Sequence, residues 1–284
     1  MSSASRSLTL SSTVRLYNGV DMPALGLGVF RSGSGRATED AVTWALDAGY
    51  RHIDTARIYR NEAEVGAAIR RWCDRYGVDR RGIFVTTKLW NDDHGYDRAR
   101  RAFEASLRSL GLAYVDLYLI HWPVPELRRE SWRALEALVE EGRCRAVGVS
   151  NFTVRHLTEL LQSSRIVPAV NQVELHPFLQ QRELVHYCAE HAIAVEAYSP
   201  LTKGRRLDDP RLAAVAADLA RSPAQVLIRW GLEKGYVVIP KSADRTRIAQ
   251  NAAVFDFQIG GEAMARLDGL DEALHIAWDP SGVD

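Results

Sequence analysis

Short apolar runs recur along the chain and alternate with longer amphipathic segments. Each run has the length of a buried strand, and the segment between two runs is long enough to hold a helix. The runs are residues 25–30, 52–54, 83–87, 115–120, 146–149, 169–173, 192–197 and 236–239. Apolar strands that alternate with helices predict a parallel sheet covered by helices, and eight is the number of strands in a closed (β/α)8 barrel.

Boundary residues support the predicted helices. In residues 97–110 the apolar side chains fall on one helical face. We expect Asp97 to cap the start of this helix and Gly111 to end it. Ser222, followed by Pro223, predicts the start of another helix, since serine caps well and proline suits the first helical turn.

The two ends of the chain predict additions to this repeat. Asn18-Gly19 tolerates positive φ and predicts a hairpin turn before the first run. Residues 262–270 predict an extra helix after the last run. Residues 1–13 are rich in serine and lack the apolar centre of a signal peptide, so we expect a flexible leader there. The rest, residues 14–284, is predicted to be a single α/β domain: a (β/α)8 TIM barrel with an N-terminal β-hairpin and an extra C-terminal helix.

Composition narrows the class of protein. Of 284 residues, 46% are hydrophobic, and 36 basic side chains balance 36 acidic ones. A chain without net charge has no long-range attraction for nucleic acid or an anionic membrane. No apolar stretch approaches the length of a membrane span, and the arginines of residues 98–108 are interpreted as the solvated face of a helix. The three cysteines are widely spaced without a Cys-x-x-Cys motif, which indicates neither a disulfide framework nor a metal site, and a cytoplasmic location is expected.

Four residues with proton-transfer chemistry follow the predicted strands or lie in the loops after them. They are Asp54, Tyr59, Lys88 and His121. In a barrel such positions converge on one rim, where catalysis is housed. We expect Asp54 to hold the Lys88 ammonium, Lys88 to lower the pKa of the Tyr59 phenol, and a neutral His121 to orient a substrate carbonyl. None of these groups can provide a hydride, so a redox cofactor is required.

Each of these residues also has a purely structural interpretation. Tyr59 alone fits a half-buried surface position, Lys88 a solvated lysine, His121 a core histidine, and Asp54 a helix cap. Their joint placement after three successive strands favours the functional interpretation. The chain contains no Gly-x-Gly-x-x-Gly loop, which disfavours a dinucleotide-binding fold of the Rossmann type.

Several motifs, in chain order, resemble those of the aldo-keto reductases. They are GYRHIDTA at 49–56, YRNE at 59–62, TTKLWN at 86–91, LYLIHWP at 117–123, GVSNF at 148–152, NQVE at 171–174 and IPKS at 239–242. The resemblance covers residues 14–280 and is closest to small prokaryotic members such as the 2,5-diketogluconate reductases. It implies a (β/α)8 barrel that binds NADPH across its C-terminal rim, with the four residues above as the catalytic tetrad.

The resemblance also implies a set of cofactor-binding residues. They are Ser150, Asn151 and Gln172 for the nicotinamide carboxamide, Tyr198 for its ring, Ser199 and Leu201 for the pyrophosphate, Lys241, Ser242 and Arg247 for the adenosine 2′-phosphate, and Gln250 and Asn251 for the adenine. Gln250 stands where the family usually has Glu, which removes a charge from the adenine contact. Lysine and arginine favour a dianionic phosphate over a hydroxyl, so NADPH is expected in preference to NADH.

Four aromatic residues are predicted to wall the substrate pocket: Phe30, Trp90, Trp122 and Trp278. Aromatic walls with few polar anchors suit small aldehydes and ketones. Trp278 has an alternative interpretation, in which it only packs the C-terminal tail against the barrel. The loop after His121 and the tail from Ala273 are short compared with many members of the family.

The leading functional prediction is a monomeric, NADPH-dependent reductase that converts aldehydes and ketones to alcohols with Tyr59 as the general acid. A first alternative is a non-catalytic NADPH-binding regulatory module, because one fold can host unrelated roles. A second is an aldolase that forms a Schiff base on Lys88. The second alternative leaves the residues that resemble a cofactor site without a role.

Overall fold

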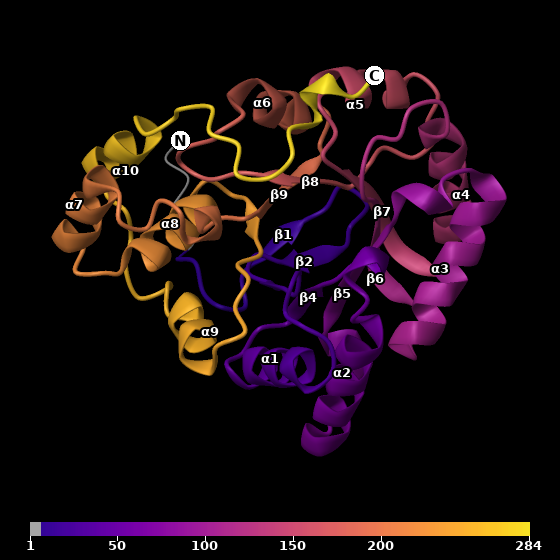
Figure 1. The fold of residues 1–284 in the computed structure, drawn as a ribbon, viewed down its shortest axis with the longest axis horizontal. Coiled ribbons are helices and arrows are strands. Elements are labelled where there is room, and N and C mark those ends of the chain that lie inside the picture. Colours follow the sequence, from indigo (N-terminus) through magenta and orange to yellow (C-terminus); the bar gives the residue numbers. More distant parts are fainter. Residues whose placement is uncertain (1–6) are drawn as a thin grey trace.

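Eight parallel strands form the centre of the molecule in the computed structural model, which describes residues 7–284 (Figure 1). Their order in the sheet follows the chain: β3 (Leu27–Gly28), β4 (His52–Asp54), β5 (Phe84–Leu89), β6 (Val115–Ile120), β7 (Cys144–Ser150), β8 (Val170–Glu174), β9 (Ala194–Tyr198) and β10 (Val237–Val238). Parallel bridges between Leu25 and Val238 and between Gly28 and Lys241 close the sheet on itself. The predicted (β/α)8 barrel is therefore confirmed.

Helices surround the strands (Figure 1). They are α1 (Arg36–Asp47), α2 (Glu62–Tyr76), α3 (Tyr96–Leu110), α4 (Arg128–Glu140), α5 (Val154–Leu161), α6 (Arg182–Glu190), α7 (Pro210–Asp218), α8 (Pro223–Glu233), α9 (Arg245–Ala252) and α10 (Gly261–Asp268). The main core fills the layer between the strands and these helices, as in other layered α/β folds. The predicted extra C-terminal helix is α10.

An antiparallel hairpin closes the N-terminal end of the barrel. Its strands are β1 (Thr13–Arg15) and β2 (Asp21–Pro23), and Gly19 has the positive φ of 85° that the turn needs. The buried Met22 packs with Phe84 and Val170, the first residues of β5 and β8, in a second apolar cluster inside the barrel. The predicted hairpin is thus confirmed.

The helix boundaries test the capping predictions. Gly111 ends α3 with a φ of 61°, and the Ser222 hydroxyl accepts a hydrogen bond from the backbone N–H of Gln225 at the start of α8, both as predicted. The prediction for Asp97 was wrong, because Gly95 is the N-cap and no side chain caps α3. Asp97 lies in the first turn instead, where its charge still favours the positive end of the helix dipole.

The predicted flexible leader, residues 1–13, falls partly outside the described residues. Within the described part, Leu8 and Leu10 pack against the main core, and a Cβ atom at Gly49 would lie 2.5 Å from Leu10 Cδ2. Residues 1–6 lie outside the description, and the division into a leader and a single domain stays a prediction. Among residues 7–284, no helix is long and apolar enough to span a membrane.

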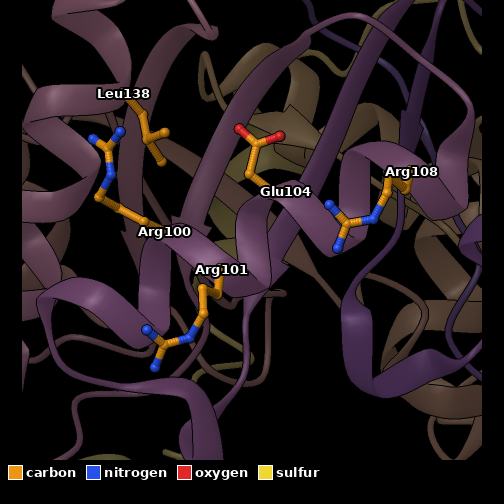
Figure 2. Close-up of a pocket in the computed structure, with 5 residues that line it drawn as sticks. All are labelled: Arg100, Arg101, Glu104, Arg108 and Leu138. Carbon is orange, nitrogen blue, oxygen red and sulfur yellow. The ribbon is translucent and has the colours of Figure 1, made fainter.

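The arginines of α3 lie on its outer face (Figure 2). Arg98, Arg101 and Arg108 are exposed, and Arg100 forms an ion pair with Glu141, with an Nη1–Oε1 distance of 2.7 Å. A surface hollow of about 360 Å³ is bordered by Arg100, Arg101, Glu104 and Arg108 of α3 and by Leu138 of α4 (Figure 2). The prediction of a solvated helix face is confirmed, and the hollow lies on the helical layer rather than at the strand ends.

Candidate active site

The carboxyl ends of three neighbouring strands bring the four predicted catalytic side chains together. Asp54 is the last residue of β4, Lys88 lies near the end of β5, and His121 directly follows β6. Tyr59 ends a 3₁₀ turn that follows β4. Parallel pairing keeps the strands in register, so these side chains share the C-terminal rim of the barrel.

Lys88 is the centre of this group. Its fully buried ammonium donates hydrogen bonds to Asp54 Oδ1 at 2.6 Å, to the carbonyl oxygen of Thr55 at 2.9 Å and to the Tyr59 hydroxyl at 3.5 Å. An ammonium has three donors, so all of them are used. Burial opposes the charge on Lys88, but Asp54 and Tyr59 outweigh it, and the pKa of Lys88 is raised. Lys88 is therefore a charged, immobilised group.

Tyr59 responds to two opposing influences. Burial raises the pKa of its phenol, and the Lys88 ammonium lowers it. The contribution of Lys88 has the predicted sign, but burial outweighs it, so the net pKa of Tyr59 is raised. The physical reason is that a buried phenolate loses its hydration, and one ammonium at 3.5 Å does not fully replace it. Tyr59 is consequently a protonated phenol held beside a positive charge.

His121 is the neutral imidazole that the sequence predicted. Burial and the nearby Lys88 charge hold its pKa well below the ordinary value. Its ring lies edge-on to Tyr59, with 5.7 Å between the ring centroids. Within residues 7–284, His121 Nδ1 is buried without a hydrogen-bond partner. The site therefore contains an unused polar atom beside the phenol.

A chain of buried polar groups continues below this rim. The Gln172 amide donates to Asp54 Oδ2 at 2.9 Å and to Glu196 Oε2 at 2.8 Å. Glu196 Oε1 lies 3.6 Å from His52 Nε2, and that nitrogen lies 3.1 Å from the Thr86 hydroxyl. The sequence analysis assigned Gln172 to a cofactor and missed Glu196 and His52. The available signal was a charged residue, Glu196, within the apolar run of residues 192–197.

The residues predicted to contact nicotinamide also lie together. The Tyr198 hydroxyl donates to Asn151 Oδ1 at 2.8 Å, and Asn151 Nδ2 donates to the His121 carbonyl at 3.0 Å. The Ser150 hydroxyl donates to the Gln172 carbonyl at 2.8 Å. Ser150 and Tyr198 are the last residues of β7 and β9, Asn151 follows β7, and Gln172 lies within β8, so three strands contribute to one polar patch next to His121.

The residues predicted to bind the phosphates and adenine follow β9 and β10. Ser199 and Leu201 lie in the turn after β9, and Ser199 has a positive φ of 50°. The others lie in the segment after β10 and in α9: Lys241, Ser242, Arg247, Gln250 and Asn251. Lys241 and Arg247 are exposed, and neither forms a salt bridge within residues 7–284. Two cations without an acidic partner fit a bound anionic group such as a phosphate.

Of the four predicted pocket-wall residues, two pack on members of the tetrad and two pack on each other. Phe30 packs on Tyr59 with a centroid distance of 5.0 Å, and Trp90 lies edge-on to His121 at 5.2 Å. Trp122 and Trp278 meet edge-to-face at 6.2 Å. Trp278 stays 75% exposed, which argues against the alternative that it only packs the tail against the barrel.

The C-terminal tail, from Ala273 onward, crosses this rim (Figure 1, yellow). The buried Glu174 carboxylate, at the end of β8, accepts hydrogen bonds from the backbone N–H groups of Ile276 and Ala277 at 2.9 and 2.8 Å. Lys203 donates to the Ile276 carbonyl at 3.0 Å, and His156 Nε2 lies 2.9 Å from the Val283 carbonyl. The tail is thus tied to several loops and helices at the rim.

Comparisons with known proteins agree with this architecture. The family model described as "Aldo/keto reductase family" matches residues 24–272. The chain is 51% identical to the 9,11-endoperoxide prostaglandin H2 reductase of Trypanosoma cruzi, covering 94% of each chain. It is 47% identical to the glyoxal reductase of Bacillus subtilis, covering 96% of this chain and 97% of that one.

A solved structure has the same fold. The aldo-keto reductase of Bombyx mori, in complex with NADP, superposes with a TM-score of 0.87 at 37% identity, covering 95% of this chain and 96% of that one. The family model spans most of the chain, and the two relatives cover nearly all of it. The chain therefore belongs to the aldo/keto reductase family.

Proposed function

We propose that the protein reduces aldehydes and ketones to alcohols with NADPH, and that Tyr59 is the general acid. The observation that carries the proposal is the Lys88 ammonium, held by Asp54 and Thr55 and directed at the Tyr59 hydroxyl. A charged group fixed next to a phenol stabilises the phenolate that remains after proton transfer. Two relatives, a glyoxal reductase and an aldo-keto reductase solved in complex with NADP, support the same class of reaction.

In this proposal NADPH supplies the hydride when it is bound at the rim. Tyr59 donates its proton to the carbonyl oxygen, and Lys88 stabilises the resulting phenolate. His121, which is neutral, donates a ring N–H to the same oxygen and orients the carbonyl. Phe30 and Trp90, which pack on Tyr59 and His121, form apolar walls that keep water from the reacting carbonyl.

The cofactor residues follow from the donor set at the rim. Ser150, Asn151 and the side-chain amide oxygen of Gln172, whose two N–H donors are engaged by Asp54 and Glu196, would bind the carboxamide. The half-buried Tyr198 ring would stack on nicotinamide. Ser199 and Leu201 would bind the pyrophosphate. The exposed Lys241 and Arg247, with Ser242, would bind the 2′-phosphate, and Gln250 and Asn251 would contact the adenine. We also propose that the protein is a monomer. A cytoplasmic location is proposed because the three cysteines, all within residues 7–284, are buried and free.

The alternatives are weaker. A Schiff-base aldolase needs an uncharged lysine, whereas the pKa of Lys88 is raised and its three donors are engaged. A non-catalytic NADPH-binding module remains the competing function. It predicts cofactor binding without turnover on any carbonyl.

The test is NADPH oxidation with a panel of small aldehydes, α-dicarbonyls, diketo sugars and ketosteroids, with NADH in parallel. Tyr59→Phe should lower kcat by at least about 100-fold, since it removes the proton donor. NADPH affinity, measured by fluorescence titration, should stay within about 3-fold, because the phenol is not placed to bind the cofactor. Tyr76→Phe, at a 52% exposed tyrosine, is the matched control. Full activity in Tyr59→Phe contradicts the mechanism, and tight NADPH binding by the unmodified protein without turnover favours the regulatory module.

A further inference from the structure

The polar chain below the tetrad contains a carboxyl group that the proposed mechanism does not use. Glu196 lies on β9 inside the barrel and is 0% exposed. It is linked to Tyr59 through three intermediate side chains: Gln172, Asp54 and Lys88. A buried carboxyl that is connected to the proton donor by four hydrogen bonds is a candidate for influencing that donor.

Within this network of buried polar side chains, the hydrogen-bond donors of Gln172 are fully used. A side-chain amide has two N–H donors, and Gln172 directs both at carboxyl oxygens, one on Asp54 and one on Glu196. The Asp54 carboxyl in turn accepts from Gln172 on one oxygen and from Lys88 on the other. Both carboxyl groups therefore orient the Gln172 amide. Asp54 Oδ2, in turn, depends on Gln172 for its hydrogen bond.

The charges in this interior do not balance if both carboxyl groups are ionised. Glu196 faces His52 and Asp54 from β4, Lys88 from β5 and the neutral Gln172 amide from β8, while its register partner on β10 is Val237. Lys88 supplies one positive charge, and burial lowers the pKa of His52 to about 3, so His52 is neutral. A second carboxylate would be a buried charge without a partner, which is costly. Burial and the Asp54 charge accordingly raise the pKa of Glu196 to about 8.

We propose that Glu196 is a positioning residue of the reductase, which in its neutral form holds Gln172 against Asp54 and which, when ionised, makes Tyr59 retain its proton. The inference rests on the proposed role of Tyr59 as the general acid. An ionised Glu196 adds a negative charge to the group around Tyr59 and raises the pKa of that phenol. Since reduction requires the protonated phenol, Glu196 extends carbonyl reduction toward alkaline pH.

The decisive variant is Glu196→Gln, which has the shape of the neutral acid and cannot ionise. Hydride transfer would be followed in single turnovers at saturating NADPH and carbonyl substrate, after brief pH jumps to values between pH 6 and pH 12, because burial raises the pKa of Tyr59 above its ordinary value of about 10. In Glu196→Gln the alkaline limb of the rate profile should lie about half to one pH unit lower than in the wild-type protein. The rate of the variant divided by that of the wild type should therefore fall about 3- to 10-fold between pH 7 and the alkaline limb. Glu183→Gln, at an exposed glutamate of α6, is the matched control and should leave the profile unchanged. Parallel profiles, or an equal loss at every pH, overturn the proposal, because they indicate only a structural role.

A second measurement does not depend on catalysis. At pH 7 the infrared spectrum should contain the carbonyl-stretch band of a protonated carboxylic acid that is missing in Glu196→Gln, and this band should vanish as the pH rises through about 8. If Glu196→Gln does not fold, Glu196→Asp keeps a titratable group whose band can be followed in the same way. Absence of the band overturns the assignment of a neutral Glu196. A present band with an active Tyr59→Phe protein contradicts the proposed function instead.

Discussion

At the scale of single residues, neighbours decide the protonation state more than residue type does. His52 and His121 are neutral because they are buried and face the positive charge of Lys88. Lys88 keeps its charge at equal burial because Asp54 and Tyr59 face it. The same interior thus excludes positive charge from two imidazoles and retains it on one ammonium, which is the arrangement a carbonyl reductase needs.

Buried neutral histidines should make the protein sensitive to acid. Burial lowers the pKa of His52 to about 3 and that of His94 to about 4, and holds that of His121 well below its ordinary value. Between pH 6.5 and these values the unfolded chain binds protons that the folded protein does not, so stability is present above pH 6.5 and is lost as the pH falls. The free energy of unfolding should drop by about 1.4 kcal/mol per pH unit for each such histidine.

Urea unfolding between pH 7 and pH 4.5 measures this loss. The His94→Gln variant cannot take up this proton. The slope of its free energy of unfolding against pH should therefore be lower by the contribution of one proton, about 1.4 kcal/mol per pH unit. His186→Gln changes a histidine side chain that is 76% exposed and should leave the slope as it is. An unchanged slope in His94→Gln would show that His94 is accessible to protons in the folded protein.

Residue-scale inference from sequence succeeded where position along a strand sufficed. Asp54, Lys88 and His121 lie at the ends of successive apolar runs, and parallel strands place such ends on one rim. The contact between Gln172 and Glu196 depends instead on which way two side chains point inside a closed barrel. That direction requires the register of β8 and β9, which apolar periodicity does not reveal.

At the scale of elements, close approach between helices depends on a single glycine. Gly66 of α2 faces α3, and a Cβ atom placed there would lie 1.7 Å from the carbonyl oxygen of Leu110. The obstacle is backbone, so it cannot move without separating the two helices. The amphipathic pattern predicted helices in this region, but it could not show that this pair approaches so closely, because the contact joins residues 44 positions apart.

Gly66→Ala should therefore destabilise the protein by at least about 2 kcal/mol, although alanine is by itself the better helix former. Gly261 is the exposed first residue of α10, and a Cβ atom added there would meet no neighbouring atom within 4 Å. Gly261→Ala should therefore change stability by less than about 0.5 kcal/mol. Urea unfolding of both variants gives the comparison. Similar stabilities for the two variants would mean that α2 and α3 separate at little cost.

At the scale of the whole molecule, the tail connects parts of the rim that are distant in sequence. Glu174 of β8 binds the backbone at Ile276 and Ala277, and Lys203 from the turn after β9 binds the Ile276 carbonyl. Trp278 then contacts Trp122, beyond β6. The placement of Trp278 at the pocket stays a prediction, and the path of the tail could not be predicted from the sequence. The tail takes part in these ties through its backbone N–H and C=O groups, which carry no signal in the side-chain pattern.

The Glu174 carboxylate is the tie whose loss should release the tail. In Glu174→Gln the amide has one acceptor oxygen in place of two, so one of the two backbone N–H groups loses its partner. Because the tail is at the surface, it should detach locally rather than unfold the barrel.

Amide hydrogen exchange of residues 274–284 should speed up by about 10-fold, which corresponds to about 1.4 kcal/mol, with little change in Tm. If Trp278 is a pocket wall as proposed, KM for carbonyl substrates should rise more than kcat falls, because Trp278 moves with the tail while Tyr59 and Lys88 stay in place. Glu183→Gln, on the neighbouring α6, controls for the loss of a charge, and unchanged exchange in Glu174→Gln would mean that the remaining ties from Lys203 and His156 hold the tail by themselves.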